Sequence, residues 1–267
     1  MAIGALPFSS VVFVLGVIGG SGLYELPGLE DVREERIESP WGEPSDALRY
    51  GRDSSQLPSH LLQFSADKKP VVVWNVTRRC NLRCVHCYAH AQDQAEANEL
   101  TFAQGQALID DLAGFGVPVV LFSGGEPLVR KDLPDLAAYA VSKGMRAVIS
   151  TNGPLITAKM AHTLKAIGLS YVGISIDGME AVNDRFRAVP GAFRAALDGI
   201  RNCQTAGIKV GLRFTINRFN VQEIPSIFQL IEEMDIPRVC FYHLVYAGRG
   251  SELVQEDLSA EQTRRTV

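Results

Sequence analysis

Three cysteines stand close together in the run Cys80-Asn81-Leu82-Arg83-Cys84-Val85-His86-Cys87. Three thiolates on one short loop can each take one corner of a cubane iron–sulfur cluster, and no fourth cysteine follows in the loop, so one iron would stay open. A structural zinc ion is the alternative, with His86 or His90 as its fourth ligand. Either metal site is typical of a reducing compartment, and we therefore expect the cytoplasm.

A second candidate feature is the turn Ser123-Gly124-Gly125-Glu126-Pro127, which follows the next predicted strand. Glycine lets the backbone approach a ligand at places where a side chain would collide. A Gly-Gly pair on its own is weak evidence for a binding site, but its position one strand-helix unit after the cysteine loop makes it a specific signal. The two features together resemble the radical S-adenosylmethionine (radical SAM) superfamily.

This resemblance implies two cofactors, a [4Fe-4S] cluster on Cys80, Cys84 and Cys87 and an S-adenosylmethionine chelated at its open iron. Reductive cleavage would give a 5′-deoxyadenosyl radical that abstracts hydrogen from a substrate, with flavodoxin or ferredoxin as the reductant. The resemblance also implies that the glycine turn and polar groups at the strand ends bind S-adenosylmethionine. The candidate cofactor-binding residues are Gly124, Gly125, Glu126, Asn152, Ser175, Asp177, Arg213 and His243.

Several of these residues have an ordinary structural interpretation as well. Asn152 and Asp177 follow strands in the runs STNG and SIDG, where either could be a turn former or a helix cap. Arg213 and Asn217 could pair with a carboxylate of cofactor or substrate, but Arg213 could equally form a surface ion pair. Between the ligands, His86 is expected to pack beside the cluster. The remaining cysteines, Cys203 and Cys240, are expected to be small buried apolar residues.

The elements that must position these groups follow a regular alternation from Lys69 onward. Short apolar runs predict strands at 70–76, 118–122, 145–150, 171–176, 208–216 and 238–244. Between them, amphipathic patterns predict helices at 101–114, 132–143, 157–167, 191–206 and 221–234, with Thr101 as an N-cap. The fold class is therefore α/β, a partial parallel (β/α)6 barrel with its chemistry at the carboxyl ends of the strands.

The region from Trp74 to Gly250 is similar to one branch of the superfamily, the enzymes that modify siroheme-derived tetrapyrroles in heme and heme d1 synthesis. The phrases that carry this are WNVTRRCNLRCVHCY, GFGVPVVLFSGGEPL, YVGISIDG, PGAF, GLRFTIN and YHLVYAGRG. The likeness implies a carboxylate-rich substrate, for which guanidinium groups are suited. The candidates are Arg213, Arg185, Arg187 and Arg249, although Arg185 and Arg187 are more simply solvated surface charges. His243 and Tyr246 are candidates to touch adenine or the tetrapyrrole, and a peptide-modifying maturase is the alternative.

The segment from Val14 to Gly51 resembles the amino-terminal strand and phosphate loop of methylthioadenosine phosphorylase, through VLGVIGGSGLY and the flanking ELPGLEDVREERIESPWGEPSDALR. A glycine-rich turn after a buried strand can hold phosphate with its N–H groups. Nothing after it resembles the rest of that fold. We therefore expect four parts: a phosphorylase-like fragment at 1–52, a linker at 53–68, the radical SAM core at 69–250 and the start of a truncated carboxyl-terminal region at 251–267.

Composition restricts the partners. The net charge of −4 and the pI near 5.8 argue against nucleic acid and anionic membrane surfaces. The apolar amino terminus has no preceding Lys or Arg and is interrupted by Pro7 and several glycines. It is therefore not expected to be a signal peptide or an anchor.

Overall fold

The computed structural model describes residues 15–17, 69–94, 96 and 98–266. Most of the predicted phosphorylase-like fragment and the linker lie outside these residues. From the fragment only strand β1, Leu15–Val17, is described, and it pairs antiparallel with the first strand of the core.

Six parallel strands form the core of the sheet, and their order in space is their order in the chain. They are β2 Val72–Thr77, β3 Val119–Gly124, β4 Arg146–Thr151, β5 Tyr171–Ser175, β6 Lys209–Thr215 and β7 Val239–Tyr242. The sheet begins at β1 and ends at β7, which do not pair, so the barrel is open. The predicted partial barrel is confirmed, with every predicted strand present.

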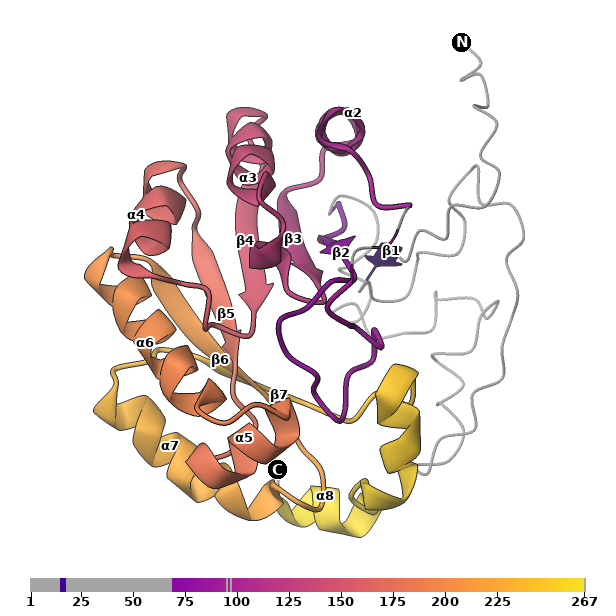
Figure 1. The fold of residues 1–267 in the computed structure, drawn as a ribbon, viewed down its shortest axis with the longest axis vertical. Helices are drawn as coiled ribbons and strands as arrows, with labels where there is room; N and C mark the ends of the chain where they lie inside the picture. The colour runs from indigo at the N-terminus through magenta and orange to yellow at the C-terminus, as the bar shows by residue number, and fades with distance from the viewer. Residues whose placement is uncertain (1–14, 18–68, 95, 97, 267) are drawn as a thin grey trace, which may run out of the picture.

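Helices connect the strands and cover one face of the sheet (Figure 1). They are α2 Phe102–Phe115, α3 Leu133–Ser142, α4 Ala158–Ala166, α5 Glu180–Arg187, α6 Ala192–Thr205, α7 Ile224–Glu233 and α8 Ala260–Thr266. In the part of the chain that the structure describes, three 3-10 helices accompany them: η4 Pro127–Val129, η5 Val221–Glu223 and η6 Gly248–Glu256. Thr101 caps α2 as predicted, in a reciprocal capping box with Gln104.

The strands alternate between two faces with a period of two residues. Residues such as Val172, Ile174 and Leu212 point toward the helices and are completely buried in one continuous core. The opposite, inner face carries polar groups, including Ser175 and Arg213, which lie opposite each other in register. This division places the apolar packing outside the barrel wall and the chemistry within it.

Helix α5 is absent from the sequence prediction. Its run Glu-Ala-Val-Asn-Asp-Arg-Phe-Arg is short and mostly polar, so a search for apolar segments does not reveal it. It packs on α6 and carries Phe186 and Arg187, both buried, toward the cysteine loop. In the described part of the chain, no helix is long and apolar enough to cross a membrane.

Candidate active site

The cysteine loop, residues 78–91, leaves the carboxyl end of β2 and crosses the mouth of the barrel (Figure 1). Cys80 and Cys84 are buried and Cys87 is half-buried. The N–H groups of Leu82 and Ala91 donate to Cys80 Sγ and Cys87 Sγ, each at 3.4 Å. Such bonds to sulfur are among the features that set the potential of an iron–sulfur cluster.

Burial, partly offset by the Leu82 N–H, raises the pKa of Cys80 to about 12. Negative charge on Cys84 or Cys87 raises it further, because the three thiols lie near one another. Thiols in this state give up their protons when a metal binds. Three thiols gathered on a buried loop with N–H donors therefore fit a three-cysteine cluster.

A buried ion pair stands against Cys84. Arg187, with only 8% of its side chain exposed, donates from Nη1 to Cys84 Sγ at 3.5 Å and pairs through Nη2 with Asp177 Oδ2. Although burial by itself would lower the pKa of Arg187, Asp177 and Cys84 raise it above its ordinary value. The sequence-based interpretation of Arg187 as a solvated charge is therefore wrong.

Asp177 is held from three directions. Its Oδ1 accepts from the Thr215 N–H at 3.0 Å, while Oδ2 faces both Arg187 and His86 Nε2, the latter at 3.3 Å. Burial lowers the pKa of His86, whose ring also packs on Phe186. The Asp177 side chain thus links β6 to the cysteine loop through Arg187.

The zinc alternative gains no support from this geometry. His86 points its Nε2 at Asp177, and His90 is exposed. Among the described residues, no three His, Cys, Asp or Glu side chains, the three loop cysteines included, form a group that could hold a metal ion as they stand, so this criterion favours neither zinc nor a cluster. The predicted packing role of His86 agrees with its burial.

One residue from the end of the barrel fastens the cysteine loop. Arg249 donates from Nε to the Cys84 carbonyl at 2.7 Å, from Nη1 to the Ala91 carbonyl at 2.9 Å and from its backbone N–H to the Cys87 carbonyl at 2.9 Å. A Cβ at Gly248 would lie 2.4 Å from the Cys87 carbonyl, so only glycine permits this approach. Arg249 thus has a structural role, while its Nη2 is buried without a hydrogen-bond partner among the described residues and its contact with a substrate carboxylate stays a prediction.

Replacing Arg249 with Ala should lower the free energy of unfolding of the iron-free chain by about 2 kcal/mol or more, because two charged hydrogen bonds are lost. Arg249→Lys should recover only part, since one ammonium cannot match the guanidinium fork. Urea unfolding measures this, and thiol-reagent kinetics should show faster labelling of the loop. Arg265→Ala, in an exposed pair with Glu261, is the control. Equal stability of the Arg249 and Arg265 variants would disprove the fastening role.

The close approach of neighbouring backbone is by itself a reason for glycine in the turn, and the predicted approach of a ligand stays a prediction. A Cβ on Gly124 would lie 2.2 Å from the Thr77 carbonyl, and one on Gly125 would lie 2.4 Å from the Arg79 carbonyl. The N–H groups of Gly125 and Glu126 donate to these same carbonyls. The turn is thus pressed against the chain that leads into the cysteine loop.

Glu126 is completely buried and uses both carboxylate oxygens within the protein. Its Oε1 accepts from the Leu128 N–H at 3.0 Å and from Thr151 Oγ1 at 2.8 Å, and Oε2 accepts from the Asn152 N–H at 2.8 Å. The Asn152 side chain then donates to Asn81 Oδ1 at 2.8 Å. Glu126 therefore positions Asn152 beside the cysteine loop.

This carboxyl group gives a pH prediction. Burial raises the pKa of Glu126 to about 7 despite its three hydrogen bonds. A raised folded-state pKa means that the native state binds more protons, so stability is present below about pH 4.5 and is lost as the pH rises through about 7. We expect the iron-free chain to lose roughly 3 kcal/mol from this group over that range.

The measurement is urea unfolding at intervals between pH 5 and 8, with Glu126→Gln as the matched variant, since Gln cannot titrate. The variant should lack this component of the pH dependence. His86, whose lowered pKa acts in the opposite direction, is common to both proteins and cancels in the difference. Identical pH profiles for the two proteins would refute the assignment.

The other predicted residues lie in different surroundings. Ser175 and Arg213 lie on the inner face, half-buried. His243 is exposed just after β7. Asn217 is completely buried, but its side chain accepts from the Phe219 N–H at 2.9 Å in a turn, which corrects its expected carboxylate contact. The hydroxyl of Tyr246 donates to Asp257.

Arg185 is a surface charge and Cys203 is a small buried residue, as expected from the sequence. The Arg185 side chain is exposed and stacks over Phe219. Cys203 is completely buried in the core, and burial raises its pKa to about 12.

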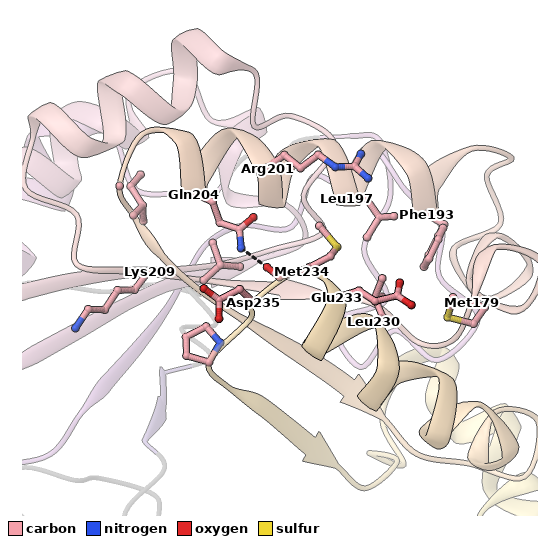
Figure 2. A pocket seen from close by; sticks show the side chains of 14 residues that line it. Met179, Phe193, Leu197, Arg201, Gln204, Lys209, Leu230, Glu233, Met234 and Asp235 are labelled. Atoms are coloured by element: carbon pink, nitrogen blue, oxygen red, sulfur yellow. Dashed lines mark hydrogen bonds between the residues drawn. The ribbon is translucent and has the colours of Figure 1, made fainter.

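An open groove of about 940 Å³ lies elsewhere, between α6 and α7 on the helical side of the sheet (Figure 2). Its lining includes Phe193, Leu197 and Leu230, with Gln204 bonded to the Met234 carbonyl at 2.6 Å. It contains none of the predicted site residues. The groove is therefore separate from the predicted site residues.

The fold and the cysteine loop define a class of protein, and comparison with known families agrees. Residues 74–231 match the model of the radical SAM superfamily, and the chain belongs to that superfamily. Membership brings the cofactors of the class, a [4Fe-4S] cluster and S-adenosylmethionine. The predicted family and fold are confirmed.

The chain is 71% identical over 225 residues to the Fe-coproporphyrin III synthase of Methanosarcina barkeri (strain Fusaro / DSM 804), covering 84% of this chain and 56% of that protein. It is 46% identical over 199 residues to the pre-heme d1 synthase of Dinoroseobacter shibae (strain DSM 16493 / NCIMB 14021 / DFL 12), covering 74% and 49%. The chain thus spans about half the length of these relatives.

The structure of Streptococcus suis SuiB bound to S-adenosylmethionine superposes with a TM-score of 0.57 at 17% identity, over 66% of this chain and 40% of that one. At this identity the likeness concerns the fold alone.

Proposed function

We propose that this chain is the radical-generating part of an enzyme that modifies a heme-related tetrapyrrole. The observation that carries the proposal is the buried cysteine loop, with three thiols, N–H donors to two sulfurs and the Arg187–Asp177 pair against the third. High identity to relatives named for coproporphyrin and heme d1 synthesis supports the tetrapyrrole.

When bound, the cluster and S-adenosylmethionine supply a carbon radical that can take hydrogen from an unactivated carbon. The residues of this chain would hold and orient these two cofactors. Cys80, Cys84 and Cys87 would hold the cluster, and Arg187 would offset negative charge at Cys84. Glu126, buried and fully bonded, would act by fixing Asn152 beside the loop and not by touching the cofactor.

The proposal also covers the partners of the chain and its location in the cell. A one-electron donor such as flavodoxin or ferredoxin would reduce the cluster, and a cytoplasmic site suits three thiols in one loop. Neither nucleic acid nor a membrane is a proposed partner, because the chain carries a net charge of −4.

The test of the substrate class is hydrogen transfer. The reconstituted chain, reduced with dithionite, is given S-adenosylmethionine and either a siroheme-derived tetrapyrrole deuterated in its side chains or a deuterated peptide. Deuterium in 5′-deoxyadenosine from the tetrapyrrole supports the proposal. Deuterium from the peptide alone would make the peptide-modifying alternative the correct one.

A further inference from the structure

Two glycines on the inner face of the barrel leave room for two long polar side chains. Gly173 on β5 and Gly211 on β6 lie opposite each other in register. A Cβ on Gly173 would lie 2.3 Å from Arg213 Nε, and a Cβ on Gly211 would lie 2.2 Å from the Tyr171 hydroxyl. Arg213 and Tyr171 therefore each lie across the wall of the barrel above a glycine of the neighbouring strand.

The direction of Arg213 separates it from the cysteine loop. Its register partner is Ser175, but its guanidinium lies over Gly173, two residues nearer the amino end of β5. Two residues of a strand span about 6.6 Å. The cysteine loop and Asp177 lie at the opposite, carboxyl end, so the guanidinium is turned away from the place of the cofactor and toward the depth of the barrel.

The surroundings of Arg213 are cationic and aromatic. Tyr242 on β7 lies beside it, with its ring centroid 6.0 Å from Arg213 Cζ, and Arg238 Cζ lies 5.7 Å from the ring of Tyr171. Arg213 Nε is buried without a hydrogen-bond partner, and neither arginine forms an ion pair with a residue of the described chain. Burial raises the pKa of Tyr171 and of Tyr242, so both hydroxyls stay protonated, and the Tyr242 hydroxyl also faces Cys240.

Two guanidinium groups and two phenols, with no carboxylate paired to either guanidinium among the described residues, supply hydrogen-bond donors for an anion. A planar guanidinium binds a carboxylate through two parallel hydrogen bonds. We propose that Arg213, with Arg238, Tyr171 and Tyr242, forms a subsite that binds a carboxylate side chain of the substrate. The inference rests on the proposed function, whose tetrapyrrole substrates carry propionate and acetate groups.

This assignment changes the role expected for Arg213 from cofactor binding to substrate binding. The subsite would hold the tetrapyrrole by its acidic edge while the carbon to be attacked faces the cysteine loop. It would also discriminate against a neutral ligand of the same shape, because such a ligand offers the half-buried Arg213 guanidinium no counter-charge.

The experiment is titration of the anaerobically reconstituted full chain with iron coproporphyrin III, followed by the Soret band. Its fully esterified form is the second probe. The unaltered chain should bind the free acid about 10- to 100-fold more tightly than the ester. Arg213→Gln should remove that preference, and Tyr171→Phe, which loses one hydroxyl, should weaken the binding of the acid by about tenfold or less. Arg201→Gln, at an exposed position on α6, is the matched control.

The outcomes separate the two proposals. Retained acid preference in Arg213→Gln would overturn the subsite and leave the tetrapyrrole assignment intact. Failure of the unaltered chain to bind either probe would overturn both. S-adenosylmethionine affinity, measured by equilibrium dialysis on the same samples, should not change in Arg213→Gln. A loss of S-adenosylmethionine affinity in this variant would indicate that Arg213 binds the cofactor, and would contradict the inference.

Discussion

Replacement of any one of Cys80, Cys84 and Cys87 with Ala should abolish the iron–sulfur absorbance and the cleavage of S-adenosylmethionine together. The two cysteines outside the loop offer no replacement, because Cys203 is completely buried in the core and Cys240 lies on β7. Each of the three thiols would occupy a different corner of the cluster, so the loss of one leaves a second iron without a protein ligand.

Iron and sulfide content, the visible absorbance near the cluster band and 5′-deoxyadenosine formation are measured on the same reconstituted samples. Cys240→Ala is the matched control, since it removes a thiol without touching the loop. The control should retain cluster and cleavage. An intact, active cluster in even one variant of Cys80, Cys84 or Cys87 would refute the ligand assignment.

The second large effect is expected at Asp177. Asp177→Leu leaves Arg187 buried without its counter-ion and removes the acceptor of the Thr215 N–H. Loss of one partner of a buried pair costs about 3–5 kcal/mol. We therefore expect urea unfolding of the iron-free chain to shift by an amount of that order, and reconstitution to load less iron.

Two further variants show whether the buried charge is the cause. Asp198→Ala breaks an exposed pair with Arg201 and should change stability by no more than about 1 kcal/mol. Asp177→Leu combined with Arg187→Met removes both charges and should be more stable than Asp177→Leu alone. If the double variant is no more stable than Asp177→Leu alone, the uncompensated charge of Arg187 is not the cause of the instability.

The fold was predictable because local patterns specify it. Apolar runs alternate with amphipathic segments from Lys69 onward, and the helix caps, such as Thr101, are where the sequence places them. Helix α5 was not predictable in this way, since its stability comes from packing against α6 and its own sequence is polar. Short polar helices of this kind depend on tertiary contacts.

The site was predictable only in its ligands. The spacing of the cysteines identifies a metal loop, but nothing in the sequence shows that Arg249 bonds to carbonyls of residues about 160 positions earlier. Likewise, Arg187 resembles a surface charge until Asp177 and Cys84 are seen beside it. The close approach of Gly124 and Gly125 to the carbonyls of residues 77 and 79 is equally a property of the fold.

The central claim is that the cysteine loop holds a cluster that cleaves S-adenosylmethionine reductively. The most direct measurement is anaerobic reconstitution with iron and sulfide, followed by dithionite and S-adenosylmethionine, with chromatographic detection of 5′-deoxyadenosine. The structure predicts formation of 5′-deoxyadenosine that depends on all of Cys80, Cys84 and Cys87. A cluster that assembles and leaves the cofactor intact, or a loop that takes up zinc and no iron, would contradict the claim.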